Sequence, residues 1–212
     1  GAELIKYASN AFLATKISFI NELANLSEKV GADIKDISSG MGSDQRIGER
    51  FLRAGPAYGG SCFPKDTRAL IDTAKKFKID LSIVNSVVTS NEKRKVLLTK
   101  KLEKILKNNF ENKVVTFLGV TFKPNTDDMR EASSIPMIKY LNKKNVRIRY
   151  YDPSGEKNEF KKLKNVRYCT NVYSACLKSD LIVLHTEWND FRFLNFKKLV
   201  KQDSFKVFDM RN

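Results

Sequence analysis

The chain has 212 residues, of which 42% are hydrophobic and 30% charged, so it is globular and long enough for one large domain or two small ones. No apolar run approaches the roughly 20 residues of a membrane-spanning helix, no signal segment opens the chain, and three widely spaced cysteines indicate a reduced, cytoplasmic protein. The net charge of +15 suggests polyanion binding, but the lysines are spread over helical faces without interleaved aromatic residues, which favours a solvated surface over a nucleic-acid interface.

The first predicted helix runs from Glu3 to about Lys29 and is apolar on two sides. One stripe comprises Leu4, Ala8, Phe12, Phe19, Leu23 and Leu26, and the other Leu13, Ile17, Ile20 and Ala24. Such a helix is expected to be buried between neighbours. Lys6 and Asn10, four residues apart, head the second stripe. Polar groups at that place predict the wall of a cleft; an exposed Lys6 in the first turn is the alternative.

A short helix and a long loop are expected next. Asp33 can cap a helix that ends near Gly40. The following stretch, residues 41–60, contains five glycines together with Arg46, Phe51, Arg53 and Tyr58. This composition is typical of a binding loop.

The segment Gly59-Gly60-Ser61-Cys62-Phe63-Pro64-Lys65-Asp66 delivers a cysteine to the start of a helix. Pro64 suits a first helical turn. A stripe of Leu70, Ile71, Ala74 and Phe77 predicts a buried helical face as far as Phe77. Cys62 would then lie beside unpaired backbone N–H groups and the positive end of the helix dipole, which favour thiolate over thiol. This is the setting of a nucleophile, and a buried structural cysteine is the alternative.

A second long helix is predicted from Leu81 to about Asn108. Its apolar spacing is broken at Asn91 and Lys95. About 28 residues would span roughly 42 Å, longer than a small domain. We expect this helix to bridge two domains and to supply part of a dimer seam, with a core helix in a monomer as the alternative.

Beyond Lys113 short apolar or β-branched runs alternate with helical patterns. Strands are predicted at 114–120, 146–151, 181–185 and 205–208, and helices at 135–143 and 172–177. This alternation predicts a parallel sheet with crossover helices. The expected fold is therefore an all-helical domain, residues 1–109, joined by the long helix to a Rossmann-like α/β domain, residues 110–212.

Ligands of open parallel sheets bind beyond the carboxyl ends of the strands. Phe122 and Lys123 follow the first predicted strand, and Arg211 follows the last. His185, at another strand end, is expected to be structural rather than catalytic.

Several segments resemble the nucleotide-sugar dehydrogenases, the family of the UDP-glucose 6-dehydrogenases that also includes GDP-mannose and UDP-N-acetylmannosamine dehydrogenases. In family order they are Ala2 to Phe12, Asp44 to Gly48, the segment Gly59 to Asp66, Thr121 to Glu131, Thr186 to Trp188 and Phe208 to Arg211. The resemblance implies oxidation of the C6 alcohol of a nucleotide sugar to a carboxylate, with two NAD+ reduced. From the long helix we expect a homodimer, and from the charge pattern and the lack of a long apolar run we expect no nucleic-acid or membrane partner.

The resemblance also assigns roles to residues. Cys62 would be the nucleophile, Lys6 would stabilise oxyanions, Asn10 would hold the hydrolytic water and Asp66 would move its protons, although an acidic residue is favourable in any first helical turn. The substrate-binding residues would be Arg46 (reaching the diphosphate from a partner subunit), Phe51, Gly59, Phe122, Lys123 and Arg211. Lys65 and Arg130 would contact NAD, and no metal is implied. Gly59 fits such a role because a residue without Cβ allows close backbone approach.

None of the ten glycines falls in the Gly-x-Gly-x-x-Gly pattern of a dinucleotide-binding domain. The family carries that motif in a domain that precedes the segment beginning at Ala2. The chain is therefore expected to be the central helical domain plus the C-terminal UDP-binding domain, able to bind UDP-glucose or UDP but inactive alone.

Within the family, Phe63 and the run from Pro124 to Asp128 favour UDP-glucose, with UDP-N-acetylmannosamine and GDP-mannose as alternatives. More remote alternatives are a nucleic-acid module, a dimerisation scaffold, which leaves the Cys62 segment unexplained, and a cysteine hydrolase, for which His185 is the only histidine base.

Overall fold

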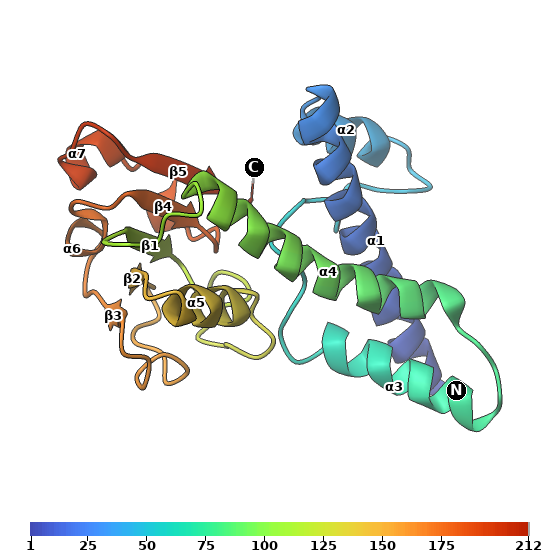
Figure 1. Cartoon of the computed structure of the whole chain (residues 1–212). Helices are drawn as coiled ribbons and strands as arrows, with labels where there is room; N and C mark the ends of the chain where they lie inside the picture. The colour runs from blue at the N-terminus through green and yellow to red at the C-terminus, as the bar shows by residue number, and fades with distance from the viewer. Residues whose placement is uncertain (212) are drawn as a thin grey trace. The chain divides into compact units, whose positions relative to one another are not determined.

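The structure is a computed structural model that describes residues 1–211. Its contacts divide it into two compact units, Gly1–Arg94 (unit 1) and Lys95–Arg211 (unit 2) (Figure 1). The division falls inside the long helix α4 (Ser82–Ile105), so the first half of α4 belongs to unit 1 and the second half to unit 2. Among the described residues, no helix is both long and apolar enough to cross a membrane.

Unit 1 contains helices α1 (Ala2–Val30), α2 (Ile34–Gly42), α3 (Phe63–Lys76) and the first half of α4. Helix α1 ends at Val30 and is capped by Gly31, whose φ of 74° lies in the left-handed region that glycine adopts easily. Asp33 caps α2 as predicted, because its side chain accepts a hydrogen bond of 2.8 Å from the Lys35 N–H. Residues 43–62 contain no regular secondary structure, in line with the predicted loop.

Only one of the two apolar stripes of α1 is buried within the described chain. Ile20 and Ala24 pack with α2, and Ala14 packs with residues of the loop and of α4. Leu4, Phe12, Phe19 and Leu26 are instead 56%, 66%, 49% and 57% exposed. The expectation that neighbours within the chain bury both stripes is therefore wrong.

Helix α3 begins at Phe63, so Pro64 lies in its first turn as predicted. Leu70 and Ile71 are buried. Phe77 is 73% exposed, because the helix ends at Lys76 before the predicted stripe is complete. Helix α4 likewise ends earlier than predicted, at Ile105 instead of near Asn108.

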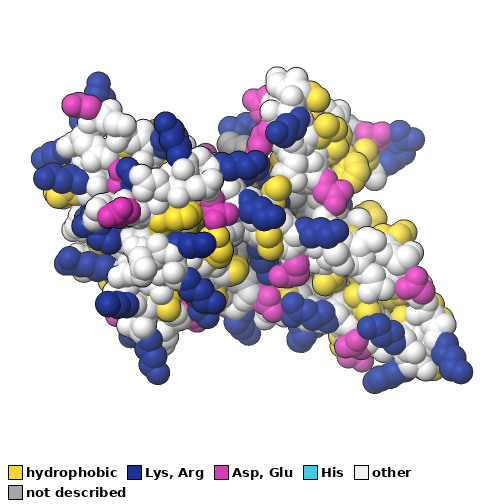
Figure 2. Space-filling model, in the orientation of Figure 1, with side chains coloured by type: hydrophobic (Ala, Val, Ile, Leu, Met, Phe, Trp, Pro, Cys, Tyr) yellow, Lys and Arg dark blue, Asp and Glu magenta, His cyan; other side chains and the backbone are white. Residues whose placement is uncertain are grey.

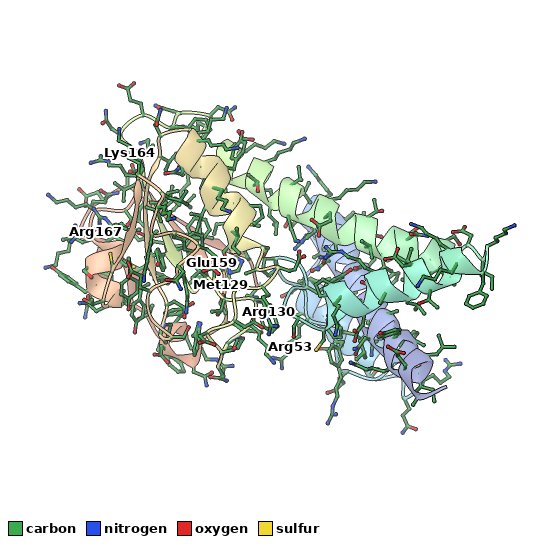
Figure 3. The ribbon with its side chains drawn as sticks, turned by 90° about the horizontal axis from the view of Figure 1, so that it is seen from below. Arg53, Met129, Arg130, Glu159, Lys164 and Arg167 are labelled. Atoms are coloured by element: carbon green, nitrogen blue, oxygen red, sulfur yellow. The ribbon has the colours of Figure 1, made fainter. Side chains whose placement is uncertain are left out.

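Unit 2 is built on a five-stranded sheet in the order β3-β2-β1-β4-β5, with every neighbouring pair parallel. The strands are β1 (Val114–Leu118), β2 (Arg147–Tyr151), β3 (Val166–Tyr168), β4 (Leu181–Leu184) and β5 (Lys206–Asp209). This confirms the predicted parallel sheet. The prediction missed β3, an edge strand of three residues without a buried apolar run, where Arg167 and the preceding Lys164 (Figure 3) keep the edge charged.

Helices cover both faces of this sheet. The second half of α4 and α5 (Ser134–Lys143) share one core with Val115 and Phe117 of β1. The helices α6 (Val172–Cys176) and α7 (Phe196–Val200) and the short 3-10 helix η1 (Asn189–Phe191) share the other core with Ile182 of β4. Side chains of alternate strand residues therefore pack against helices on opposite faces of the sheet, as in a doubly wound fold.

Candidate functional site

Cys62 is exposed at the N-cap of α3, and the other two free cysteines, Cys169 and Cys176, are buried. Burial raises the pKa of the Cys169 thiol and raises that of Cys176 to about 12. The Cys62 carbonyl accepts the Asp66 N–H at 2.8 Å, and the Ser61 hydroxyl lies 3.7 Å from the Cys62 sulfur. The alternative of a buried structural cysteine is therefore wrong for Cys62.

Asp66, which lies one helical turn after Cys62, is the centre of a cluster of polar side chains in unit 1. Its side chain is fully buried, and its Oδ2 accepts a hydrogen bond of 2.6 Å from Asn10 Nδ2 and lies 3.8 Å from Lys6 Nζ. Its Oδ1 lies 3.9 Å from Lys65 Nζ but accepts no hydrogen bond from the described residues. A buried oxygen of this kind can accept a hydrogen bond from water. The Lys6 side chain is 57% exposed, as a first-turn lysine at the surface would be, while its ammonium stays close to this carboxylate.

Phe63, the residue after Cys62, belongs to a cluster of aromatic rings. The Phe63 ring packs edge-on against Phe51 at 6.0 Å and against Tyr58 at 6.1 Å between ring centroids. Phe51 is 40% exposed, and Gly59 is buried. Phe51 and Gly59 were predicted site residues, whereas the place of Tyr58 in this cluster was not predicted.

In unit 2 the strand order reverses between β1 and β4, and in open α/β sheets ligands bind at such a point. Gly119, which follows β1, has φ 73°, and a Cβ on it would lie 2.5 Å from the Thr186 Cβ. Only glycine allows the ends of β1 and β4 to approach so closely. The Thr186 hydroxyl then donates to the Thr121 carbonyl at 2.7 Å and ties the two strand ends together.

Arg211 lies at this edge and contacts both strand ends. Its Nε donates to the His185 carbonyl at 3.0 Å, and one terminal nitrogen donates to the Phe122 carbonyl at 3.4 Å. The other lies 3.8 Å from a Glu187 carboxylate oxygen. Burial lowers the pKa of Arg211, partly offset by neighbouring carboxylates. Lys123 is exposed with its Nζ 5.4 Å from the centroid of the Phe122 ring. The predicted Phe122, Lys123 and Arg211 thus lie together, and the contribution of Glu187 was not predicted.

His185 is fully buried and has the structural role expected of it. Its Nε2 bonds the Ser133 hydroxyl at 2.8 Å and its Nδ1 bonds the Thr186 hydroxyl at 3.0 Å. Burial, with a smaller contribution from the Arg211 charge, lowers its pKa to about 3. A neutral imidazole with both nitrogens engaged fixes the end of β4.

The three arginines of the predicted site each follow an aspartate by two residues. The Arg46 guanidinium donates hydrogen bonds to the Asp44 carboxylate, and the Arg130 guanidinium (Figure 3) donates to the Asp128 carboxylate. Each arginine thereby holds the pKa of its aspartate below the ordinary value. The side chains of Arg46 and Arg130 are 89% and 68% exposed. Both cations therefore face solvent in a fixed orientation, while Arg211 binds Asp209 only through its backbone N–H.

The two units together define a class of protein: a helical unit that presents an exposed cysteine at a helix start, on the same chain as a parallel α/β unit with basic side chains beyond its strand ends. Residues 1–93 match the family model for the central domain of the UDP-glucose/GDP-mannose dehydrogenase family. Residues 116–212 match the model for the UDP binding domain of the same family. The chain belongs to the UDP-glucose/GDP-mannose dehydrogenase family.

Relatives and solved structures agree with this assignment. The chain is 47% identical, over its whole length, to the UDP-glucose 6-dehydrogenase of Rickettsia typhi, covering 49% of that protein. It is 46% identical, again over its whole length, to UDP-glucose 6-dehydrogenase YwqF of Bacillus subtilis, covering 48% of it. A solved UDP-glucose dehydrogenase from Pyrobaculum islandicum superposes on 99% of the chain with a TM-score of 0.88 and 32% identity, and 47% of that structure is covered. The chain thus spans about half the length of the relatives it matches.

Proposed function

We propose that this chain forms the central and nucleotide-sugar-binding parts of a UDP-glucose 6-dehydrogenase, which oxidises the C6 alcohol of UDP-glucose to the carboxylate of UDP-glucuronate. The observation that carries the proposal is the exposed Cys62 one helical turn before a buried Asp66 that bonds Asn10 and lies near Lys6. The names of the relatives at 46–47% identity support the choice of substrate. Dehydrogenation of UDP-N-acetylmannosamine or GDP-mannose is the alternative.

NAD+, when bound, would accept a hydride in each of the two oxidation steps. The described residues offer it two exposed cations, Lys65 and Arg130, which suit its phosphates. The chain contains no Gly-x-Gly-x-x-Gly motif, so its own residues fit only the periphery of a dinucleotide. We therefore propose that another domain supplies the rest of the NAD site.

Cys62 would act on the aldehyde produced by the first oxidation. Its sulfur bonds to the aldehyde carbon, whose oxygen takes up a proton to give a thiohemiacetal. Loss of a hydride from that carbon, together with the hydroxyl proton, then leaves a thioester. Water then adds to the thioester carbonyl, the carbon–sulfur bond breaks and the thiolate leaves with the carboxylate product formed. The Lys6 ammonium would stabilise negative charge on the carbonyl oxygen, a contribution whose loss typically costs about 10² to 10³ in rate. Asn10 would position the water, and Asp66 Oδ1, which accepts no hydrogen bond from the described residues, would accept a proton from it.

We propose that Phe122, Lys123 and Arg211 bind the nucleotide sugar beyond the strand ends of unit 2. In unit 1 we propose Phe51 and Gly59 as further substrate-binding residues, and Arg46 would reach the diphosphate of a substrate bound to a second copy of the chain. The exposure of the Arg46 side chain supports this role, since Asp44 fixes its direction while its remaining N–H groups face solvent.

A homodimer is part of the proposal. Two grooves in unit 1, of about 370 and 300 Å³, run beside the exposed stripe of α1 and share Ile83 of α4. Phe12 lines the first groove and Phe19 the second. Exposed apolar surface of this kind marks an interaction site, and we propose that a second copy of the chain covers it.

A nucleophilic thiol needs a reducing compartment, so we place the protein in the cytoplasm.

A nucleic-acid module is a weaker candidate. Figure 2 shows Lys and Arg side chains dispersed among Asp and Glu over the visible face, without one continuous basic patch. Dispersed charge of this kind suits a solvated surface better than a phosphate backbone.

The experiment that tests the proposal is the variant Cys62→Ala in the turnover-competent protein that carries this chain. Formation of UDP-glucuronate, followed by NADH absorbance and by chromatography of the product, should fall at least 10³-fold, because the aldehyde lacks a nucleophile. Cys169→Ala, which changes a buried cysteine, should retain turnover. Normal product formation by Cys62→Ala would exclude the assignment.

A further inference from the structure

The apolar spacing of the long helix breaks at Asn91, and the contacts of this residue give the reason. Asn91 and Arg94 of α4 are only 3% and 6% exposed, and Asn21 of α1 is 3% exposed. Buried polar side chains require partners. All three find them in the loop segment 55–58, which leads toward Cys62.

The three side chains hold both ends of this segment by its backbone. The Asn21 Oδ1 accepts the Gly55 N–H at 2.8 Å, and the Arg94 Nε donates to the Gly55 carbonyl at 3.0 Å. The Asn91 Oδ1 accepts the Tyr58 N–H at 2.9 Å, while its Nδ2 donates to the Tyr58 carbonyl at 3.1 Å. Every backbone donor and acceptor at the two ends of the segment is thus bonded by a side chain from α1 or α4.

Arg94 also ties the segment to α1. Its Nη1 donates to the Asn21 carbonyl at 3.2 Å and to the Asn25 Oδ1 at 2.5 Å. Burial lowers its pKa to about 10, with the Glu28 carboxylate opposing the shift. The planar fork of a guanidinium can serve these acceptors at once, which a lysine ammonium at the same place could not reproduce. We call Asn21, Asn91 and Arg94 the loop clamp.

The held segment is strained. Ala57 has φ 141°, a backbone conformation that residues other than glycine rarely adopt. Such a conformation persists only where the surrounding structure enforces it, and strain of this kind occurs at ligand and catalytic sites. Cys62 follows Tyr58 by four residues, and the Tyr58 ring packs edge-on against Phe63. The direction in which the chain leaves Tyr58 therefore fixes the position of the Cys62 thiol at the start of α3.

We propose that Asn21, Asn91 and Arg94 are positioning residues for Cys62: by bonding the backbone of Gly55 and Tyr58 they hold the strained loop that delivers the thiol to the start of α3. The inference rests on the proposed role of Cys62 as the nucleophile. A purely structural role, in which the three side chains only complete the hydrogen bonds of a buried loop backbone, is the competing explanation, and it predicts no local effect on the thiol.

The test compares three substitutions on α4 of the 212-residue chain. Asn91→Ala removes both bonds to Tyr58, and Asn91→Asp keeps the acceptor for the Tyr58 N–H but loses the donor to its carbonyl. Asn85→Ala is the matched control, because its side chain bonds Asp80 and not the loop. Two quantities are measured in each variant: amide hydrogen exchange over residues 55–62, and the rate of Cys62 alkylation by iodoacetamide. Cys62→Ser identifies the signal of that thiol.

With Asn91→Ala we expect the Tyr58 amide to exchange at least tenfold faster and the change to stay within the loop. The rate constant of Cys62 alkylation should change at least threefold. The change should be in the direction of the rate constant of this cysteine in the urea-unfolded chain. Asn91→Asp should lie between Asn91→Ala and the parent, and Asn85→Ala should match the parent. Unchanged exchange and alkylation, or an exchange increase spread evenly over α1 and α4, would overturn the inference. These measurements involve no turnover, so they can fail while the Cys62→Ala test succeeds, and the reverse.

Discussion

At the scale of single residues, His185 links burial to the pH dependence of stability. Its folded pKa of about 3 lies far below the ordinary 6.5. Below pH 6.5 the unfolded chain therefore binds a proton that the folded chain does not. The stability that His185 contributes is fully present above pH 6.5 and is lost as the pH falls toward 3. Each pH unit in that window corresponds to about 1.4 kcal/mol.

We predict that His185→Gln, which keeps polar atoms near Ser133 and Thr186, flattens this dependence. Between pH 7.5 and 5.0 the parent should lose about 2 kcal/mol more of its free energy of unfolding than the variant. Urea unfolding of both proteins at the two pH values measures the difference. Equal losses in the two proteins would show that His185 does not carry the effect.

Sequence could predict those residues whose role follows from local pattern. The place of Cys62 at the start of a helix followed from a glycine pair and Pro64, because both act on the backbone of their own segment. The loop clamp could not be predicted in this way. Asn91 appeared only as a break in an apolar stripe, and nothing local marks Asn21 or Arg94, since their hydrogen-bond partners in the loop lie more than 30 residues away along the chain.

At the scale of elements, helical periodicity predicted α1, α3 and α4 but not what covers each face. The stripe with Leu4, Phe12, Phe19 and Leu26 has the same spacing whether this chain or another molecule packs against it. Strand β3 was missed for a related reason: an edge strand of three residues is defined by its pairing with β2, which leaves little trace in its own composition.

We predict that Phe19→Asp weakens self-association of the chain at least about 30-fold, because a carboxylate in a covered apolar groove would be buried without a partner. Analytical ultracentrifugation over a concentration series measures the effect. Phe193→Asp is the matched control, since Phe193 is 96% exposed and lines neither groove. Association unchanged by Phe19→Asp, or weakened equally by both substitutions, would place the interface elsewhere.

At the scale of the whole molecule, length and composition allowed one large domain or two small ones, and the contacts of the chain divide it into two compact units. The parallel sheet could be predicted because its strands alternate with helical patterns along the chain. The position of the boundary between the units could not be predicted from the sequence. It falls between Arg94 and Lys95, inside an uninterrupted helix, where no change of composition marks it.

The charge of +15 allows two accounts of what the chain binds, a specific nucleotide sugar or any polyanion. They differ in how binding responds to base and salt. A pocket that recognises uracil discriminates between nucleotides at fixed salt, whereas phosphate-backbone binding weakens steeply with salt whatever the base.

Isothermal titration of the chain with UDP-glucose, UDP-N-acetylmannosamine and GDP-mannose, at low and at moderate salt, therefore tests the central claim most directly. We predict that UDP-glucose binds measurably at both salt concentrations and that GDP-mannose binds at least about tenfold more weakly, a difference of about 1.4 kcal/mol. Equal affinity for all three ligands, falling steeply as salt is raised, would contradict a nucleotide-sugar site in this chain.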